Sequence, residues 1–348
     1  MKIIADFFRS ILIFFGEIIL LILLLEGLCS FALSFTAACL TSELSATRYD
    51  EFLGWVSRPD IQERNMFGPG LSFRTNAQSF RNAEIFDPAV PKGKIRIICS
   101  GDAFTQGHGV DNDHAWPAQF ATLDWRLQVV NMGQAGFGLD QSYLRYIRDG
   151  LILDHKMHIF ALTAADFSRV KNSKFLGIYD KPVVTLEKGN IRVENVPVPG
   201  SSFWAQRWRD IARVGKNFRT YELVSGLSQK LVPRPSALSA SDLQDIKEIA
   251  LALFADMHKK IMDKKGKLVI VFLPRSEDYY RDDTDALRFW LRMELKARGI
   301  VMIDLVDEVR KLPIRDYKNF FRGHYSEAGN RFVAQYLYKM FTASGDFT

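Results

Sequence analysis

The chain opens with a long apolar run that differs from everything after it. From Ser10 to Leu40 nearly every residue is apolar, which exceeds the roughly 20 residues that a helix needs to cross a bilayer. Lys2 and Arg9 precede the run, and because positive residues tend to stay in the cytoplasm, the domain that follows is expected outside. A cleaved signal peptide is the alternative, although its apolar region usually spans only about 7–15 residues. We therefore predict an uncleaved single-pass transmembrane anchor over residues 1–42.

Two acidic residues interrupt this run. A carboxylate at the centre of a membrane helix costs about 2.5–3.5 kcal/mol, so each of them calls for an explanation. Glu26 lies where the outer interface is expected, and a structural role is the simpler interpretation there. Glu17 follows Gly16, a small residue that permits close helix approach. Two interpretations of Glu17 stay open: a contact with another membrane protein, or a protonated or snorkelling acid near the inner headgroups.

After the anchor, short apolar runs alternate with amphipathic stretches. Five runs predict buried strands, at Lys94–Cys99, Leu127–Asn131, His158–Thr163, Lys267–Leu273 and Ile300–Leu305. Helices are predicted at Pro117–Leu123, at Gln141–Gly150, from about Ser241 onward, at Asp285–Arg298 and after Ser326. Strands that alternate with helices favour a parallel sheet covered on both faces. The predicted fold class is therefore α/β, a three-layer α/β/α sandwich with a parallel sheet.

Three segments fall outside this alternation. Residues 50–81 are rich in turn formers and lack a helical period, so we expect loops and short strands that wrap over the sheet. Pro182–Leu186 and Ile191–Glu194 flank a glycine turn and predict a β-hairpin. Ser201–Val232 is basic and contains aromatic residues, and we expect helices that cover one face. All of this fits one domain, 43–348, with the hairpin and the helical insertion at about 175–240.

Composition narrows the classes of function. Of the 348 residues, 47% are hydrophobic and 25% are charged, which is typical of a folded protein. The net charge of +6 comes from scattered Lys and Arg without a basic block, so a nucleic acid partner is not expected. Three cysteines cannot form a disulfide framework. The six histidines show no metal-ligand spacing and the glycine turns do not match a dinucleotide fingerprint, so neither a metal nor a cofactor is expected.

The strongest motif follows the first predicted strand of the sheet. It reads Gly101-Asp102-Ala103-Phe104-Thr105-Gln106-Gly107, at a strand end where ligands gather in open α/β sheets. These letters resemble the first block of the SGNH/GDSL hydrolases, Gly-Asp-Ser-Phe-Thr-x-Gly, in which the serine is the nucleophile. Ala103 stands at the serine position, and a methyl group cannot attack a carbonyl. The neighbouring hydroxyls, Ser100 and Thr105, are expected to point elsewhere.

Further stretches extend the resemblance over nearly the whole chain. Leu53-Gly54-Trp55 resembles the lead-in of membrane-anchored bacterial SGNH-like proteins. Gly136 matches the second block, whose glycine N–H helps to form the oxyanion hole. Ala165 stands where the family has an Asn that donates to the oxyanion, and His324 matches the catalytic base. The resemblance implies an SGNH/flavodoxin-like fold and a vestigial catalytic site at Ala103 and these three positions.

Positions beside these four are weaker candidates. Asp102 and Asp166 are expected cleft neighbours, with capping of the following segment the simpler role for Asp166. His108 lies just beyond the first block. Phe321 and Arg322 occupy the positions where the family's catalytic Asp precedes the histidine, and Arg322 would oppose an imidazolium. Loss of that orienting carboxylate alone can lower turnover about 10⁴-fold.

Taken together, these departures predict a site without hydrolytic chemistry. An engineered substitution would explain Ala103 only, whereas a naturally degenerate site explains every departure. The first hypothesis is a catalytically inactive protein of the bacterial inner membrane, with a periplasmic domain that acts as an interaction or assembly subunit beside other membrane proteins. The second is a cell-envelope carbohydrate esterase or O-acyltransferase accessory, for which the resemblance implies envelope polysaccharide as the substrate. The third is a module that binds carbohydrate or acyl groups without chemistry.

Overall fold

The computed structural model describes residues 2–36, 46–175, 179–200 and 240–347. The chain divides into two units, which are described separately. One is Met1–Thr41 with Ser201–Ala237, of which the structure describes the N-terminal helix, and the other is Ser42–Gly200 with Leu238–Thr348. The helices expected over Ser201–Val232 lie outside the described residues.

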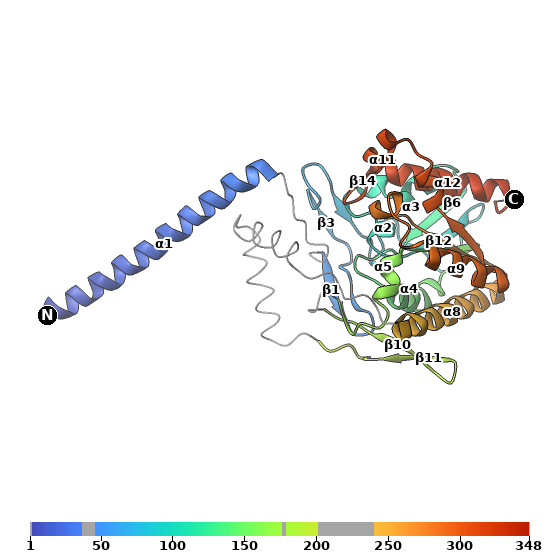
Figure 1. Cartoon of the computed structure of the whole chain (residues 1–348), viewed down its shortest axis with the longest axis horizontal. Coiled ribbons are helices and arrows are strands. Elements are labelled where there is room, and N and C mark those ends of the chain that lie inside the picture. The colour runs from blue at the N-terminus through green and yellow to red at the C-terminus, as the bar shows by residue number, and fades with distance from the viewer. Residues whose placement is uncertain (1, 37–45, 176–178, 201–239, 348) are drawn as a thin grey trace. The chain divides into compact units, whose positions relative to one another are not determined.

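The described residues of the first unit form one long helix, α1 (Lys2–Thr36), drawn in blue in Figure 1. Its stretch Arg9–Cys29 is long and apolar enough to cross a membrane. A signal sequence near an N-terminus has the same length and composition. Glu17 lies within this stretch with an exposed side chain.

The second unit is built on a parallel five-stranded sheet, as predicted. Its strands are β5 (Ile95–Ser100), β6 (Leu127–Asn131), β7 (Met157–Leu162), β12 (Lys267–Phe272) and β13 (Val301–Asp304). They lie in the order β13-β12-β7-β5-β6, and every neighbouring pair is parallel. The chain leaves β5 toward β6 on one side and then crosses to β7 on the other. Ligands bind at the carboxyl ends of the strands beside such a switch point.

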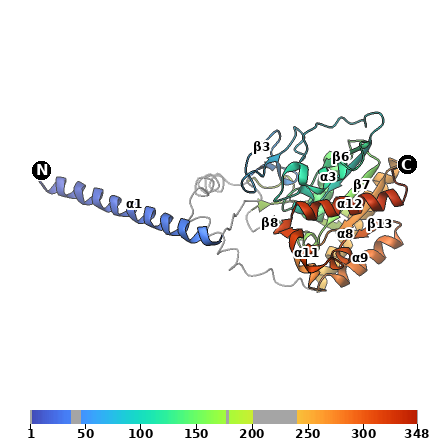
Figure 2. The ribbon, with the colours of Figure 1, turned by 90° about the horizontal axis from the view of Figure 1, so that it is seen from above.

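The two-residue period of the strands sorts their side chains onto two apolar faces. Helices α4 (Leu139–Arg145), α8 (Ala240–Asp263) and α9 (Asp285–Ala297) cover the face that carries Ile98 and Phe160. Helices α3 (Trp116–Ala121) and α12 (Glu327–Ala343) cover the face that carries Ile97 and Ile159. Figure 1 shows α3 and α12 on one side of the sheet and α4, α8 and α9 on the other, and Figure 2 looks onto the side of α3 and α12. The predicted three-layer α/β/α sandwich is confirmed.

Short elements border this sandwich. The lead-in forms two antiparallel pairs, β1 (Thr47–Asp50) with β2 (Gly54–Ser57) and β3 (Gln62–Glu63) with β4 (Phe73–Arg74). Strands β10 (Val183–Glu187) and β11 (Asn190–Glu194) form the predicted hairpin. A further pair is β8 (Lys174–Phe175) with β9 (Tyr179–Asp180).

The connections at the carboxyl ends of the strands are also short and regular. Helix α2 (Ala103–Gln106) follows β5, α5 (Ala164–Ser168) follows β7, and the 3₁₀ turn η3 (Ser276–Tyr279) follows β12. Later in the chain come α10 (Val306–Arg310), α11 (Ile314–Phe320), β14 (Phe321–Arg322) and β15 (His324–Tyr325). These connections build the candidate site.

Candidate functional site

The floor of the site is the turn between β5 and α2. A Cβ on Gly101 would lie 2.3 Å from Oγ1 of Thr105, so only glycine lets the backbone pass this closely. Asp102 then caps α2, because its Oδ1 accepts a hydrogen bond from the N–H of Phe104 at 2.9 Å. Ala103 is therefore the first residue of α2, and its methyl group borders the pocket.

Neither hydroxyl beside Ala103 replaces the missing serine. Ser100 is buried, and its Oγ lies 2.8 Å from Nε2 of His158 in the core. Thr105 is also buried, and neither residue borders the pocket. Ala103 thus borders the floor of the pocket, and neither neighbouring hydroxyl residue does.

Gly136 borders the pocket from the turn after β6. Its φ of +82° is a left-handed conformation, and a Cβ there would lie 2.7 Å from the ring of Phe175. Trp55 of the lead-in supports this turn, because its ring packs 5.5 Å from that of Phe175 and its Nε1 donates to the carbonyl O of Ala135 at 3.0 Å. Within the described chain, the N–H groups of Gly136 and Ala103 make no hydrogen bond.

The end of β7 supplies the next side of the pocket. Ala165 borders it with a methyl group, where a side-chain donor would be worth about 10²–10³ in rate to an oxyanion-stabilising enzyme. Asp166 is buried and forms a capping box with Thr163, whose N–H donates to its Oδ2 at 2.7 Å. Asp166 does not border the pocket. Its capping role is the one that its sequence position favours.

Arg169 ties these segments together, and sequence reasoning missed it. Its Nη1 donates to the carbonyl O of Phe137 at 2.7 Å, to Oδ1 of Asp166 at 2.7 Å and to Oδ2 of Asp102 at 3.4 Å. Burial and the nearby Asp102 raise the pKa of Asp166, and the Arg169 guanidinium opposes that shift. Arg169 borders the pocket one helical turn beyond Ala165, and this spacing was the available signal.

The opposite wall comes from Arg275-Ser276-Glu277, which sequence reasoning also missed. All three border the pocket, and Nη2 of Arg275 donates to Oε1 of Glu277 at 2.8 Å. The turn closes on Asp278, whose Oδ2 accepts the N–H of Arg275 at 2.7 Å. The hydroxyl of Tyr317 donates to the carbonyl O of Ser276 at 2.5 Å. These bonds hold the wall as a defined turn.

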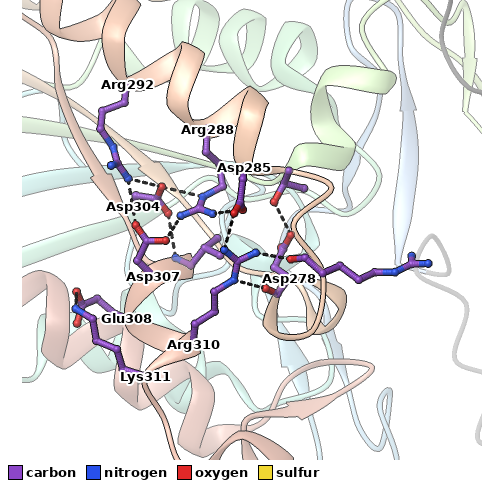
Figure 3. Close-up of polar contacts among 12 residues, drawn as sticks. Asp278, Asp285, Arg288, Arg292, Asp304, Asp307, Glu308, Arg310 and Lys311 are labelled. Carbon is purple, nitrogen blue, oxygen red and sulfur yellow. Dashed lines mark hydrogen bonds and ion pairs between the residues drawn. The ribbon is translucent and has the colours of Figure 1, made fainter.

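A network of Arg and Asp side chains braces this wall from behind (Figure 3). Nε of Arg310 donates to the carbonyl O of Asp278 at 2.7 Å, and its Nη1 donates to Asp285 at 2.9 Å. Arg288, which is almost fully buried, donates to Asp285 at 2.6 Å and to Asp304 at 2.8 Å. The network links η3 to α9, α10 and the end of β13. A wall fixed in this way can present its polar groups in one arrangement.

His324 closes the pocket from β15. Tyr325 anchors this strand, because its hydroxyl donates to the carbonyl O of Pro274 at 2.7 Å. The His324 ring lies 4.7 Å from the ring of Phe104 and 4.6 Å from that of His108. His108 lies behind it, and burial, with added effects from His324 and Arg81, lowers the pKa of His108 to about 3. His108 is therefore neutral at pH 7.

Arg322 is not part of the pocket. It pairs with His324 across the β14–β15 hairpin, and its side chain is exposed. Phe321 packs against Tyr317 and Phe320. The two positions at which a family acid would precede His324 therefore bring no carboxylate to the pocket.

These segments enclose a cavity of about 210 Å³. Its lining residues are Asp102, Ala103, Phe104, Gly136, Thr163, Ala165, Arg169, Arg275, Ser276, Glu277, Gly323 and His324. The four predicted vestigial positions thus meet in one pocket, and Asp102 lies beside them. His108, Asp166 and Arg322 lie outside its lining, and Glu17 belongs to the other unit. In the part of the chain that the structure describes, no group of three or more His, Cys, Asp or Glu side chains could hold a metal ion.

No protein-family model and no curated protein matches this chain. Solved structures of similar fold include an acetyl xylan esterase, at 12% identity and a TM-score of 0.43 over 71% of this chain and 99% of that chain. A GDSL-like lipase from Bacteroides thetaiotaomicron has 12% identity and a TM-score of 0.41, over 74% of this chain and 93% of that chain. A lipase/acylhydrolase from Enterococcus faecalis has 12% identity and a TM-score of 0.38, over 72% of this chain and 96% of that chain. Structural similarity at these TM-scores supports no inference about the activity of this chain. The SGNH/GDSL-like fold is recognised by the order of the strands in the sheet and by the four motif positions, Ala103, Gly136, Ala165 and His324, that border one pocket.

Proposed function

We propose that this chain is a membrane-anchored protein with an SGNH-like domain that does not hydrolyse esters and acts as an interaction or assembly subunit of a membrane complex. The observation that carries the proposal is Ala103 at the nucleophile position of a formed, braced pocket. Ala165 adds to it, because it removes a second group that hydrolysis would use. A pocket that keeps its shape without these groups is suited to binding.

The anchor and its orientation are part of the same proposal. Arg9–Cys29 can span a bilayer, and Lys2 and Arg9 lie on its N-terminal side. The N-terminus is then cytoplasmic, and the domain is periplasmic at a bacterial inner membrane. Mass spectrometry of the protein from membranes tests retention of the helix. A mature chain that starts after Cys29 would identify a signal sequence instead.

Glu17 is the proposed contact with a membrane partner. It is an exposed carboxylate inside a span where an unpaired charge costs about 2.5–3.5 kcal/mol, and a polar group on a partner helix would offset that cost. Purification of the full chain in a mild detergent is expected to bring a second membrane protein with it. Glu17→Leu should lose that protein, and Glu26→Leu is the matched control. A monomer that emerges alone from native membranes would overturn the proposal.

A second candidate, an envelope carbohydrate esterase or O-acyltransferase accessory, is favoured by one observation. Ser276 and His324 border the same pocket, so a hydroxyl and an imidazole are present although Ala103 is not a serine. We expect no labelling of the natural chain by a fluorophosphonate probe. Labelling that is lost in Ser276→Ala and kept in Ser100→Ala would support the esterase and exclude the inactive protein.

The Ala103→Ser variant distinguishes a site that lacks only the serine from a site that lacks several catalytic groups. If only the serine was lost, this single change should restore turnover of an acetyl ester. We expect the variant to stay at background, because Ala165 supplies no side-chain oxyanion donor, whose loss costs about 10²–10³ in rate. The two positions before His324 that would carry the family's acid hold Phe321 and Arg322. Turnover well above that of the natural chain would contradict a degenerate site.

A further inference from the structure

A second cavity lies at the other end of the sheet, where the parallel strands begin. It has a volume of about 420 Å³ and is independent of the pocket described above. Its lining residues are Val90, Gly93, Lys94, Ile95, Arg96, Arg126, Lys156, Asp346 and Phe347. We infer that this cavity binds an amphiphilic anion, a phosphate or carboxylate headgroup that carries a short apolar chain.

The sheet topology gathers basic side chains at this end. Lys94 immediately precedes β5, Arg126 precedes β6 and Lys156 precedes β7. Because these three strands are adjacent and parallel, the residues before them lie side by side at one edge. Lys267, the first residue of β12, extends the row. Four residues that are far apart in sequence therefore form one basic edge.

Only part of this positive charge is neutralised within the protein. Arg126 pairs with Asp124 at 2.7 Å, and Lys267 pairs with Asp346, the one acid of the lining, at 2.6 Å. Lys94 donates to a backbone carbonyl of Trp125 and forms no ion pair among the described residues, although its charge acts on Asp124 over a longer distance. The exposed ammonium group of Lys156 makes no hydrogen bond or ion pair within that same part of the chain. Two cations at the cavity are thus available to an anion.

The rest of the lining is apolar, which sets the class of ligand. Val90, Ile95 and Phe347 form this part of the wall. Phe347 is held in place, since its ring lies 5.7 Å from that of Tyr338 and 6.2 Å from that of Phe120. Such a wall offers nothing to a bare inorganic anion, and the lysines offer nothing to a neutral hydrocarbon. A ligand with both parts uses the whole cavity.

Calorimetric titration of the full chain in a neutral maltoside detergent tests this inference. Hexyl phosphate is expected to bind at least about tenfold more tightly than hexanol or inorganic phosphate, because it alone uses both parts of the cavity. Hexanoate, in a separate titration, distinguishes a carboxylate headgroup from a phosphate one. Equal affinity for hexyl phosphate and hexanol, or for hexyl phosphate and inorganic phosphate, would overturn the inference.

Matched variants assign the binding to this cavity and correct for ligand taken up by the micelle. Lys94→Gln/Lys156→Gln should weaken hexyl phosphate by about tenfold or more, since charge-assisted hydrogen bonds are lost. Lys296→Gln/Lys318→Gln removes the same charge from two exposed positions on α9 and α11 and should bind as the natural chain does. Val90→Asp should weaken hexyl phosphate more than inorganic phosphate. Equal binding by the two double-lysine variants would contradict the assignment.

Discussion

The two ends of the central sheet treat charge in opposite ways. At the carboxyl end, Asp102 and Asp166 are buried and share Arg169, and buried Asp140 pairs with buried Lys181. At the amino end, Lys94 and Lys156 are exposed, and neither forms an ion pair with a carboxylate among the described residues. Buried side chains that form ion pairs fix the positions of the segments that carry them, whereas exposed charges without an ion pair remain available to ligands. The carboxyl end thus holds its buried charges in a fixed geometry, whereas the amino end, beside the buried Arg96, keeps two exposed lysines that can attract a ligand.

The largest expected effect tests the buried charges at the carboxyl end. Lys181→Met leaves Asp140 buried without its cation and should lower the free energy of unfolding by about 3–5 kcal/mol. Lys181 also donates to the carbonyl O of Asn172 at 3.2 Å, so one change releases two segments. Denaturant unfolding measures the loss. Arg192→Met, which breaks the exposed pair with Glu187, is the control and should cost less than about 1 kcal/mol. Similar losses in both variants would remove the contrast.

A second test concerns the buried histidine behind the pocket. Burial lowers the pKa of His108 to about 3, while the unfolded chain binds this proton near pH 6.5. Stability from a neutral His108 is therefore complete above pH 6.5 and is lost as the pH falls toward 3. Between pH 7 and pH 5, His108→Phe should lose about 2 kcal/mol less unfolding free energy than the natural chain. Parallel curves for the two proteins would show that His108 does not titrate in this way.

His155 and His158 keep part of the acid sensitivity in that variant. Burial is the main cause that lowers the pKa of both, so each also favours the unfolded state when it is protonated. The stability of His108→Phe should therefore still fall with acid, on a shallower slope.

A smaller effect is expected at the glycine turn of the pocket. Gly136→Ala adds a Cβ to a left-handed residue that faces the Phe175 ring at 2.7 Å. Gly189→Ala, in the β10–β11 hairpin, has a similar φ of +79° and no atom within 4 Å of the added Cβ. The backbone cost of about 1–2 kcal/mol is common to both, so the excess at Gly136 measures the close approach. Equal changes in unfolding free energy for the two variants would show that the Phe175 ring moves aside at no measurable cost.

The smallest expected effect belongs to the amino end. Lys94→Gln/Lys156→Gln should change the free energy of unfolding by no more than about 0.5 kcal/mol, because neither ammonium group is buried or ion-paired. Thermal unfolding measures this change. A large loss of stability would mean that these lysines support the fold, and the contrast between the two ends would fail.

Much of the architecture followed from local pattern. The length of α1, the five strands and the β10–β11 hairpin depend on runs of neighbouring residues, and each was predictable for that reason. The four vestigial positions, Ala103, Gly136, Ala165 and His324, were found through motif letters. Ala103, Gly136 and Ala165 meet in one cavity because they follow parallel strands that end at the same edge, whereas His324 reaches it from the separate β14–β15 pair.

Other features depended on contacts between distant residues. The wall at Arg275–Glu277 has no motif, and its shape depends on Tyr317 and on Arg310, which lie more than thirty residues away. Arg169 gains its role only because Phe137 and Asp102 fold against it. The basic edge has the same origin, since its lysines are scattered in sequence and are gathered only by strand order. The sequence by itself determined the helices, the strands and the alanine at position 103, because these depend on local residue types. Only the tertiary structure decided which charges are buried and matched and which remain free, because both depend on the packing of distant segments.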